Sequence, residues 1–120
     1  MDLFSQVIRD FIRLPHIGAW AEAEELFEVA ASRKPAHWLI PVRACKAVGG
    51  SQEQALPVIV AIGCAHVGIL LVDDMLDDDP RGDYHSIGMP AASNLACFFQ
   101  AAALRAVSQC TRELSSQLLP

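Results

Sequence analysis

Residues 51–79 read SQEQALPVIVAIGCAHVGILLVDDMLDDD, and the predicted architecture is built around this stretch. From Ala55 to Val72 it contains 18 consecutive residues without a formal charge, and a run of aspartates follows at once. Ser51 followed three residues later by Gln54 is the pattern of a capping box, which starts a helix. The stretch therefore predicts a long central helix that is apolar all round and acidic at its C-terminal end.

The uncharged run is also long enough to be considered a membrane-spanning helix. Against this interpretation, Pro57 and Gly63 interrupt the run, and the dense carboxylate cluster ends it. A helix buried on every side in a globular core has the same composition. Asp2 and Asp10 lie in an N-terminal region that lacks the basic-then-apolar pattern of a signal peptide. We therefore expect a cytoplasmic protein without an integral membrane span.

The rest of the chain also predicts helices, because apolar residues recur at spacings of three and four and no strand pattern is visible. Gly-Gly and Pro mark where helices stop, and a stretch rich in Pro, Gly and Asp indicates a loop. The prediction is a single all-α domain over residues 1–120 with about five helices. The predicted segments are helices over residues 2–14, 18–33, 35–50, 51–77 and 90–114, with a loop over residues 78–90.

Charge and cysteine placement indicate which partners and which compartment to expect. The net charge is −5, and no basic stripe is present, so we expect no nucleic-acid partner. The cysteines lie far apart without CxxC spacing, each within an apolar run, and are interpreted as small buried hydrophobes in a reducing compartment. They are Cys45, Cys64, Cys97 and Cys110.

The aspartates of residues 73–79 have the spacing of a cation site. Asp73 and Asp77 share one face of a helix a single turn apart, and Asp74 and Asp78 form the adjacent pair. Carboxylates at this spacing repel each other and oppose the negative end of the helix dipole, unless a cation lies between them. Mg²⁺ prefers such oxygen ligands. The alternative is a solvated acidic loop.

The stretch LLVDDMLDDDPRG, residues 70–82, resembles the first aspartate-rich motif, DDxxD followed by Arg-Gly, of the trans-isoprenyl diphosphate synthases. The segment KPAHWLIPVRACKAVGG, residues 34–50, resembles the upstream segment of that family, and a helix with Asn94 follows at the expected distance. The resemblance extends from about Ala19 to Arg112. It implies the N-terminal half of the isoprenoid synthase helical bundle.

The resemblance implies a Mg²⁺-dependent prenyltransferase that condenses an allylic diphosphate with isopentenyl diphosphate to a longer polyprenyl diphosphate. In that family the first aspartate motif holds magnesium ions that bind the diphosphate of the allylic substrate. By position, Asp73 and Asp77 are implied as the principal metal ligands, and Asp74 as a supporting ligand. Asp78 and Asp79 are interpreted mainly as loop charges.

The same resemblance implies an isopentenyl diphosphate site. Lys34, His66 and Arg81 match three of the positions of that site, and His37 occupies a position where the family has Arg. Pro80 replaces the first Arg of the family's Arg-Arg pair. Arg binds phosphate through two hydrogen bonds and is always charged, so these replacements imply a weakened or altered pocket.

Each of these residues also has a plain structural interpretation. Lys34 can simply end the second helix, and Arg81 can pair with Asp79 or Asp83. His66, on an otherwise apolar helix, can be a hydrogen-bonded core residue. The residues alone leave these alternatives open.

Product length in the family depends on side chains one turn before the first aspartate. Those positions are Gly68 and Ile69, and neither is aromatic. The resemblance therefore implies an open tunnel and a product of geranylgeranyl length or longer.

After Glu113 only LSSQLLP remains, and the family's second aspartate motif has no counterpart. We therefore expect a chain that is inactive alone, as a fragment, one part of a split enzyme, or a noncatalytic subunit that partners an active synthase. Its helices alone would leave a large apolar face uncovered, which predicts association as a homodimer or heteromer. A terpene cyclase-like protein and a structural magnesium-binding module are the other interpretations.

Overall fold

A computed structural model describes the backbone of residues 2–15 and 20–118, and side chains in these ranges as far as residue 110. The described chain is all-α, as predicted, and its fourth α-helix is the long apolar one. The predicted start of the second helix, at residue 18, lies outside the described residues. In order, the elements are α1 (Leu3–Ile12), α2 (Ala21–Ser32), the 3-10 helix η1 (Ala36–Leu39), α3 (Ile40–Ala47), α4 (Gln52–Leu76), α5 (Tyr84–Ile87) and α6 (Met89–Leu118).

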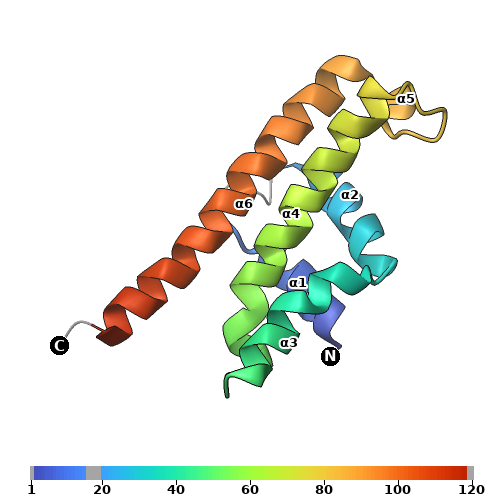
Figure 1. Cartoon of the computed structure of the whole chain (residues 1–120). Helices are drawn as coiled ribbons and strands as arrows, with labels where there is room; N and C mark the ends of the chain where they lie inside the picture. The colour runs from blue at the N-terminus through green and yellow to red at the C-terminus, as the bar shows by residue number, and fades with distance from the viewer. Residues whose placement is uncertain (1, 16–19, 119–120) are drawn as a thin grey trace.

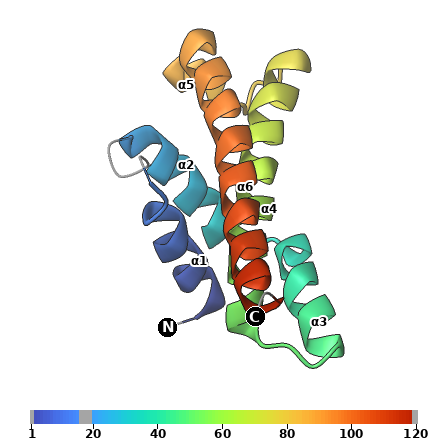
Figure 2. The same cartoon turned by 90° about the vertical axis from the view of Figure 1, so that its left-hand side faces the viewer.

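Helix α4 lies at the centre of the arrangement. It packs most extensively against α6, which runs beside it in the opposite direction, and less extensively against α1, α2, η1 and α3 (Figure 1). Seen from the side, α1 and α2 lie together on one flank and α3 lies on the other (Figure 2). Towards its C-terminal end α6 diverges from α4 (Figure 1).

The predicted capping box starts α4. The Ser51 backbone N–H donates to Gln54 Oε1 at 2.8 Å, and the Gln54 N–H donates to Ser51 Oγ at 3.3 Å. Helix α4 then continues for 25 residues through Pro57, which is about 37 Å at the usual rise per residue. It ends where Asp77 takes the C-cap position. The acidic motif therefore lies at the end of a core helix.

Fully buried aromatic side chains hold the helices around α4. Phe11 of α1 stacks on Phe27 of α2 with ring centroids 4.0 Å apart, and it lies 5.8 Å from Phe99 of α6. The ring centroids of Trp38, in η1, and Phe27 lie 5.5 Å apart. This cluster joins the N-terminal elements to α6 across the middle of α4.

Two glycines let neighbouring elements approach α4 closely. A Cβ atom on Gly63 would lie 2.9 Å from ring atoms of both Phe27 and Trp38. A Cβ atom on Gly68 would lie 3.3 Å from the Ala96 carbonyl oxygen and from Phe99 Cβ. The glycines that interrupt the apolar run in the sequence are therefore packing positions.

By length and composition, α4 could cross a membrane, and 56% of its most apolar 18-residue window is buried within the fold. Such burial is what a central helix of a globular core requires. The structure thus gives the apolar run a packing role within the protein.

Two predictions need correction. The predicted loop over residues 78–90 contains the short helix α5, and α6 begins one residue before Pro90. Of the four cysteines only Cys64 is fully buried, and burial raises the pKa of its thiol to about 12. Cys97 is exposed, because it lies on the outer face of α6.

The glycine packing gives a stability prediction. Gly to Ala inside a helix ordinarily stabilises by about 1 kcal/mol, whereas an extra methyl group in a packed core costs about 1–3 kcal/mol. At Gly63 the neighbours are rigid buried rings, so we expect Gly63→Ala to lower the free energy of unfolding, measured by urea denaturation. Gly68→Ala is the matched control. Its added methyl group would lie 3.3 Å from the nearest atoms, so its loss in the free energy of unfolding should be smaller. Equal stability of the two variants would contradict this packing.

Candidate functional site

The candidate site is at the acidic C-terminal end of α4. Asp73 and Asp74 lie in its last turns, and the Asp77 N–H donates to the Asp73 carbonyl oxygen at 2.8 Å. Asp77 keeps right-handed helical backbone angles, so Asp73 and Asp77 lie on adjacent turns of one face. Both are exposed and Asp74 is half-buried. The predicted pairing of Asp73 with Asp77 on one face is consistent with this geometry.

The segment after α4 folds back over the end of the helix. Asp78 has a φ of +49°, a left-handed conformation that turns the chain. The Asp79 N–H then donates to the Asp74 carbonyl oxygen at 2.9 Å. Gly82 comes so close that a Cβ atom there would lie 2.8 Å from Asp74 Cβ. The loop therefore covers Asp74 and leaves Asp73 and Asp77 open.

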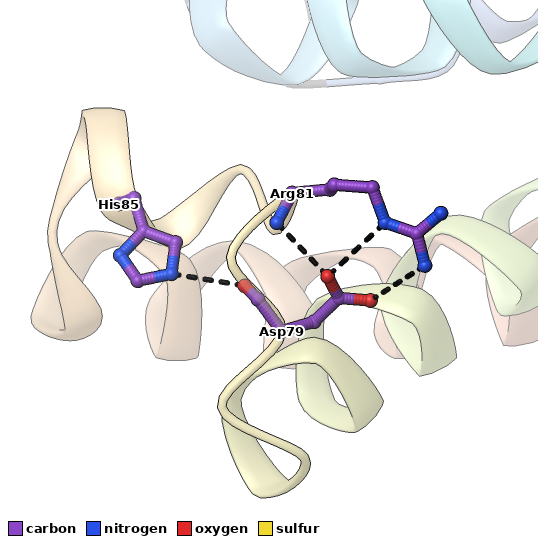
Figure 3. A network of polar contacts seen from close by, with 3 residues as sticks. All are labelled: Asp79, Arg81 and His85. Carbon is purple, nitrogen blue, oxygen red and sulfur yellow. Dashed lines mark hydrogen bonds and ion pairs between the residues drawn. The ribbon is translucent and has the colours of Figure 1, made fainter.

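Asp79 organises this loop, as Figure 3 shows. Its Oδ1 accepts from the Arg81 backbone N–H at 2.9 Å and from Arg81 Nε at 3.3 Å, and its Oδ2 accepts from the guanidinium at 3.4 Å. His85 Nε2 lies 2.9 Å from the Asp79 carbonyl oxygen. Arg81 holds the pKa of Asp79 below its usual value. The structural interpretation of Arg81, an ion pair with Asp79, is therefore observed.

Tyr84 engages the remaining aspartate of the loop. Its hydroxyl donates to Asp78 Oδ1 at 2.8 Å, and this bond, together with burial, raises the pKa of Tyr84 to about 12. The geometry gives Asp78 and Asp79 structural partners within the loop. Their interpretation as loop charges is consistent with these contacts.

Asp74 is crowded by other carboxylates. Its pKa is raised, first by burial and then by the negative charges of Asp79, Asp83 and Asp73, while Arg81 acts in the opposite direction. Negative charge thus accumulates beside the C-terminal end of α4, where the helix dipole already disfavours it. A divalent cation would relieve this repulsion.

The donor set suits a hard cation that is shared with a ligand. In the described part of the chain, no three His, Cys, Asp or Glu side chains come together as a preformed metal cage. Mg²⁺ commonly takes one or two protein carboxylates, with the remaining ligands supplied by water and substrate phosphate oxygens. Asp73 and Asp77, exposed on one face, fit that mode.

His66 lies on α4 two turns before Asp73. Because positions 66, 73 and 77 are separated by seven and four residues, the three side chains project from the same face of the helix. His66 is half-buried, and its Nδ1 accepts from the indole N–H of Trp38 at 3.0 Å. The ring of His37 meets the His66 ring edge-on, with centroids 4.5 Å apart. The structure thus brings together two of the predicted substrate-binding residues.

Lys34 follows the C-terminal end of α2 with a φ of +49°, and its N–H donates to the Ala31 carbonyl oxygen at 2.9 Å. Glycine is the usual residue at such a left-handed helix terminus. Lys34 therefore does end α2, and it does so in a conformation that is unfavourable for a side chain. Hydrogen bonds from Ser5 lower the pKa of Asp2, and the positive charge of Lys34 adds to this effect.

An apolar groove of about 460 Å³ lies between α4 and α6. It is lined on α4 by Val58, Ile62 and Ala65 and on α6 chiefly by Ala103 and Leu104, and none of the described side chains that line it is charged.

Ile69 is 53% exposed and follows Ile62 and Ala65 at helical spacing, so it extends the groove side of α4 towards Asp73. Gly68, the other position implied in chain length, packs against α6 instead. The chain-length roles of both residues stay predictions.

Two contributors to the site were not among the predicted site residues. Trp38 is a fully buried core residue whose indole N–H contacts His66, and Asp83 acts on the pKa of Asp74 across the folded loop. Tryptophan within an apolar segment gives no local signal of a polar contact 28 residues away. The acidic composition of the loop was the available signal for Asp83.

Comparison with models of protein families, with curated proteins and with solved structures gave no match to this chain. The resemblance to the isoprenyl diphosphate synthases therefore rests on the residues and motifs quoted above. Any function built on it is a proposal.

The crowding at Asp74 predicts an effect on stability that depends on pH. A carboxyl whose pKa is raised in the folded state destabilises the fold above that pKa, and the penalty fades as the pH falls through it. We therefore expect Asp74→Asn to raise the melting temperature at pH 7, and the gain to shrink as the pH approaches 4. The measurement is thermal unfolding by circular dichroism between pH 4 and 8.

Asp79→Asn is the control with the same change of charge. The pKa of Asp79 is lowered, so its carboxylate stabilises the fold above the unfolded pKa, and this contribution is lost as the pH falls. Asp79→Asn should therefore lower the melting temperature at pH 7. Shifts of the same sign in both variants would contradict the described charge arrangement.

Lys34 permits a test of its two interpretations. Lys34→Gly removes the left-handed strain and should stabilise the fold by about 1 kcal/mol relative to Lys34→Ala, which keeps the strain. If the ammonium group binds diphosphate, both variants should lose affinity for isopentenyl diphosphate equally, measured by calorimetry. Unchanged affinity in both variants would leave Lys34 as a helix terminus alone.

Proposed function

We propose that this chain is part of a Mg²⁺-dependent prenyltransferase that condenses an allylic diphosphate with isopentenyl diphosphate. The product would be a longer polyprenyl diphosphate, of geranylgeranyl length or longer. In this proposal residues 1–120 supply one diphosphate-binding face of the enzyme. Polypeptide outside this chain supplies the remainder, so the chain alone would bind substrate without turning it over.

The observation that carries the proposal is the composition of one face of α4. His66, Asp73 and Asp77 project from this face, and the apolar groove between α4 and α6 runs along its neighbouring side. A prenyl diphosphate combines a highly charged head with a long hydrocarbon tail. An acidic helix end that could hold Mg²⁺, beside an apolar groove, would match both parts of such a molecule.

In the proposed reaction the bond between C1 and oxygen of the allylic diphosphate breaks, and its electron pair leaves with diphosphate. The double bond of isopentenyl diphosphate forms the new carbon–carbon bond, and a proton is then lost. Bound Mg²⁺ would supply positive charge that stabilises the departing diphosphate. Asp73 and Asp77 would hold the ion, Asp74 would support them, and Ile69 would contact the tail.

For the second substrate, His37 and His66 would face the diphosphate of isopentenyl diphosphate, with Lys34 three residues before His37 in the chain. Arg81 would act from the loop after α4, where Asp79 now holds its guanidinium. That exposed ion pair is worth little in water, so diphosphate could replace the carboxylate as the partner of Arg81. Association with a second helical chain, as a homodimer or heteromer, stays part of the proposal.

Binding of farnesyl diphosphate in MgCl₂, measured by calorimetry, tests the metal-binding face. Asp73→Asn and Asp77→Asn should each weaken binding by about tenfold, which is ~1.4 kcal/mol, because each removes one carboxylate from the cation site. Omitting Mg²⁺ should abolish the difference between these variants and the wild type.

Asp78→Asn is the matched control, since it makes the same change of charge one position away. Asparagine keeps the Oδ1 atom that accepts from the Tyr84 hydroxyl, so the loop should persist. An equal loss of affinity in Asp78→Asn would show a general charge effect and would contradict a specific role for Asp73 and Asp77.

Turnover with radiolabelled isopentenyl diphosphate and farnesyl diphosphate, with the native partner present, separates the function classes. Elongated product supports the prenyltransferase. A cyclic hydrocarbon formed without uptake of isopentenyl diphosphate indicates a terpene cyclase-like protein. If neither product forms, the chain is a noncatalytic subunit or a structural module.

A further inference from the structure

The contact between Trp38 and His66 determines where the His66 ring carries its proton. An indole N–H can only donate, so His66 Nδ1, 3.0 Å away, must present its lone pair. The neutral imidazole therefore carries its hydrogen on Nε2. Nε2 is the ring nitrogen that Trp38 leaves available to a ligand.

Trp38 itself is held rigidly. It is fully buried, and its ring centroid lies 5.5 Å from that of Phe27 and 6.2 Å from that of Phe4. The absence of a side chain at Gly63 makes room for the far edge of the indole. The core thus fixes the donor, and the donor fixes the imidazole.

The surroundings of His66 keep it neutral. Burial, and then the nearby charge of His37, lower the pKa of His66 below its usual value. Among the described residues, His37 on η1 is the titratable group whose charge acts on it, and Trp38 carries none. A second proton would have to enter at Nδ1, directly opposite the indole N–H, so the hydrogen bond also opposes protonation.

We infer that Trp38 is a positioning residue that locks His66 as the Nε2–H tautomer, so that His66 presents a neutral hydrogen-bond donor to an anionic phosphate oxygen. The identification of that oxygen with isopentenyl diphosphate rests on the proposed function. With Nδ1 occupied by Trp38 and Nε2 protonated, His66 cannot accept the proton lost in the condensation. His66 therefore binds and orients substrate and is not the base.

The test is nuclear magnetic resonance of the full chain labelled with ¹⁵N-histidine. Long-range ¹H–¹⁵N correlations report the tautomer of each ring, and a titration from pH 5 to 8 reports its pKa. We expect wild-type His66 as the Nε2–H tautomer with a lowered pKa. Trp38→Phe should give mixed tautomers and a pKa nearer to 6.5.

Trp20→Phe is the matched control. Trp20 packs on Phe98, with ring centroids 4.9 Å apart, and should leave the tautomer and pKa of His66 unchanged. An Nδ1–H tautomer in the wild type overturns the inference even if Trp38→Phe fails to fold. An unchanged His66 signal in a folded Trp38→Phe variant also overturns it.

A pair of substitutions at His66 tests the donor role. His66→Gln keeps an acceptor for Trp38 and a donor for the ligand, so it should retain affinity for isopentenyl diphosphate within about threefold. His66→Leu should lose about tenfold, ~1.4 kcal/mol. Equal losses in the two variants would overturn a hydrogen-bonding role.

The failure of the inference and the failure of the proposed function are distinguishable. The tautomer and its dependence on Trp38 are measured without substrate. Addition of isopentenyl diphosphate with MgCl₂ should then shift the His66 Nε2–H resonance. The expected tautomer without such a shift would overturn the assignment of the phosphate acceptor, and with it the proposed function at this site, while the role of Trp38 would stand.

Discussion

Covering α4 is the constraint on which the rest of the structure depends. A helix of 25 residues that is apolar on all sides exposes unfavourable surface in water unless other elements surround it. Helix α6 covers one side along most of its length, and the N-terminal elements cover another through the Phe11, Phe27 and Trp38 cluster. Where α6 diverges, the groove between it and α4 remains uncovered.

The same constraint positions the acidic motif. Since α4 is held in the core, its C-terminal end has a defined place in the fold, and helix geometry sets the spacing of the residues there. The loop that follows is tied down by its own contacts, Asp79 to Arg81 and Asp78 to Tyr84. Those contacts occupy two aspartates of the cluster and leave Asp73 and Asp77 exposed on one face. Our proposal for a cation and diphosphate site uses this division of roles.

Trp38 links the packing of the fold to the proposed chemistry. Its ring belongs to the core, and its single polar atom reaches His66 on the face that also carries Asp73. A buried tryptophan generally needs a partner for its N–H, and here a histidine provides it. The need to satisfy one buried donor thus sets the protonation state of a residue at the candidate site.

The local features of the structure could be predicted from the sequence. The all-α class and the length of α4 follow from periodicity, and the capping box at Ser51 follows from backbone preferences that act over a few residues. So does the end of α3 just before Gly49, which has a φ of +91°. The pairing of Asp73 with Asp77 on one face belongs here too, because helix geometry alone places residues four apart together. The short helix α5 was missed because Pro, Gly and Asp in its surroundings indicate a loop.

Which of several similar residues lie at the candidate site depends on the folded arrangement of the chain. In sequence the aspartates of the motif and loop are alike, yet Arg81 and Tyr84 engage Asp79 and Asp78, and burial acts on Asp74. Likewise nothing near Trp38 in the chain indicates His66, since the bond joins residues 28 positions apart. The contact between Trp38 and His66 and the burial of Asp74 depend on how the helices and the loop pack, and packing is a property of the whole fold that local preferences do not encode.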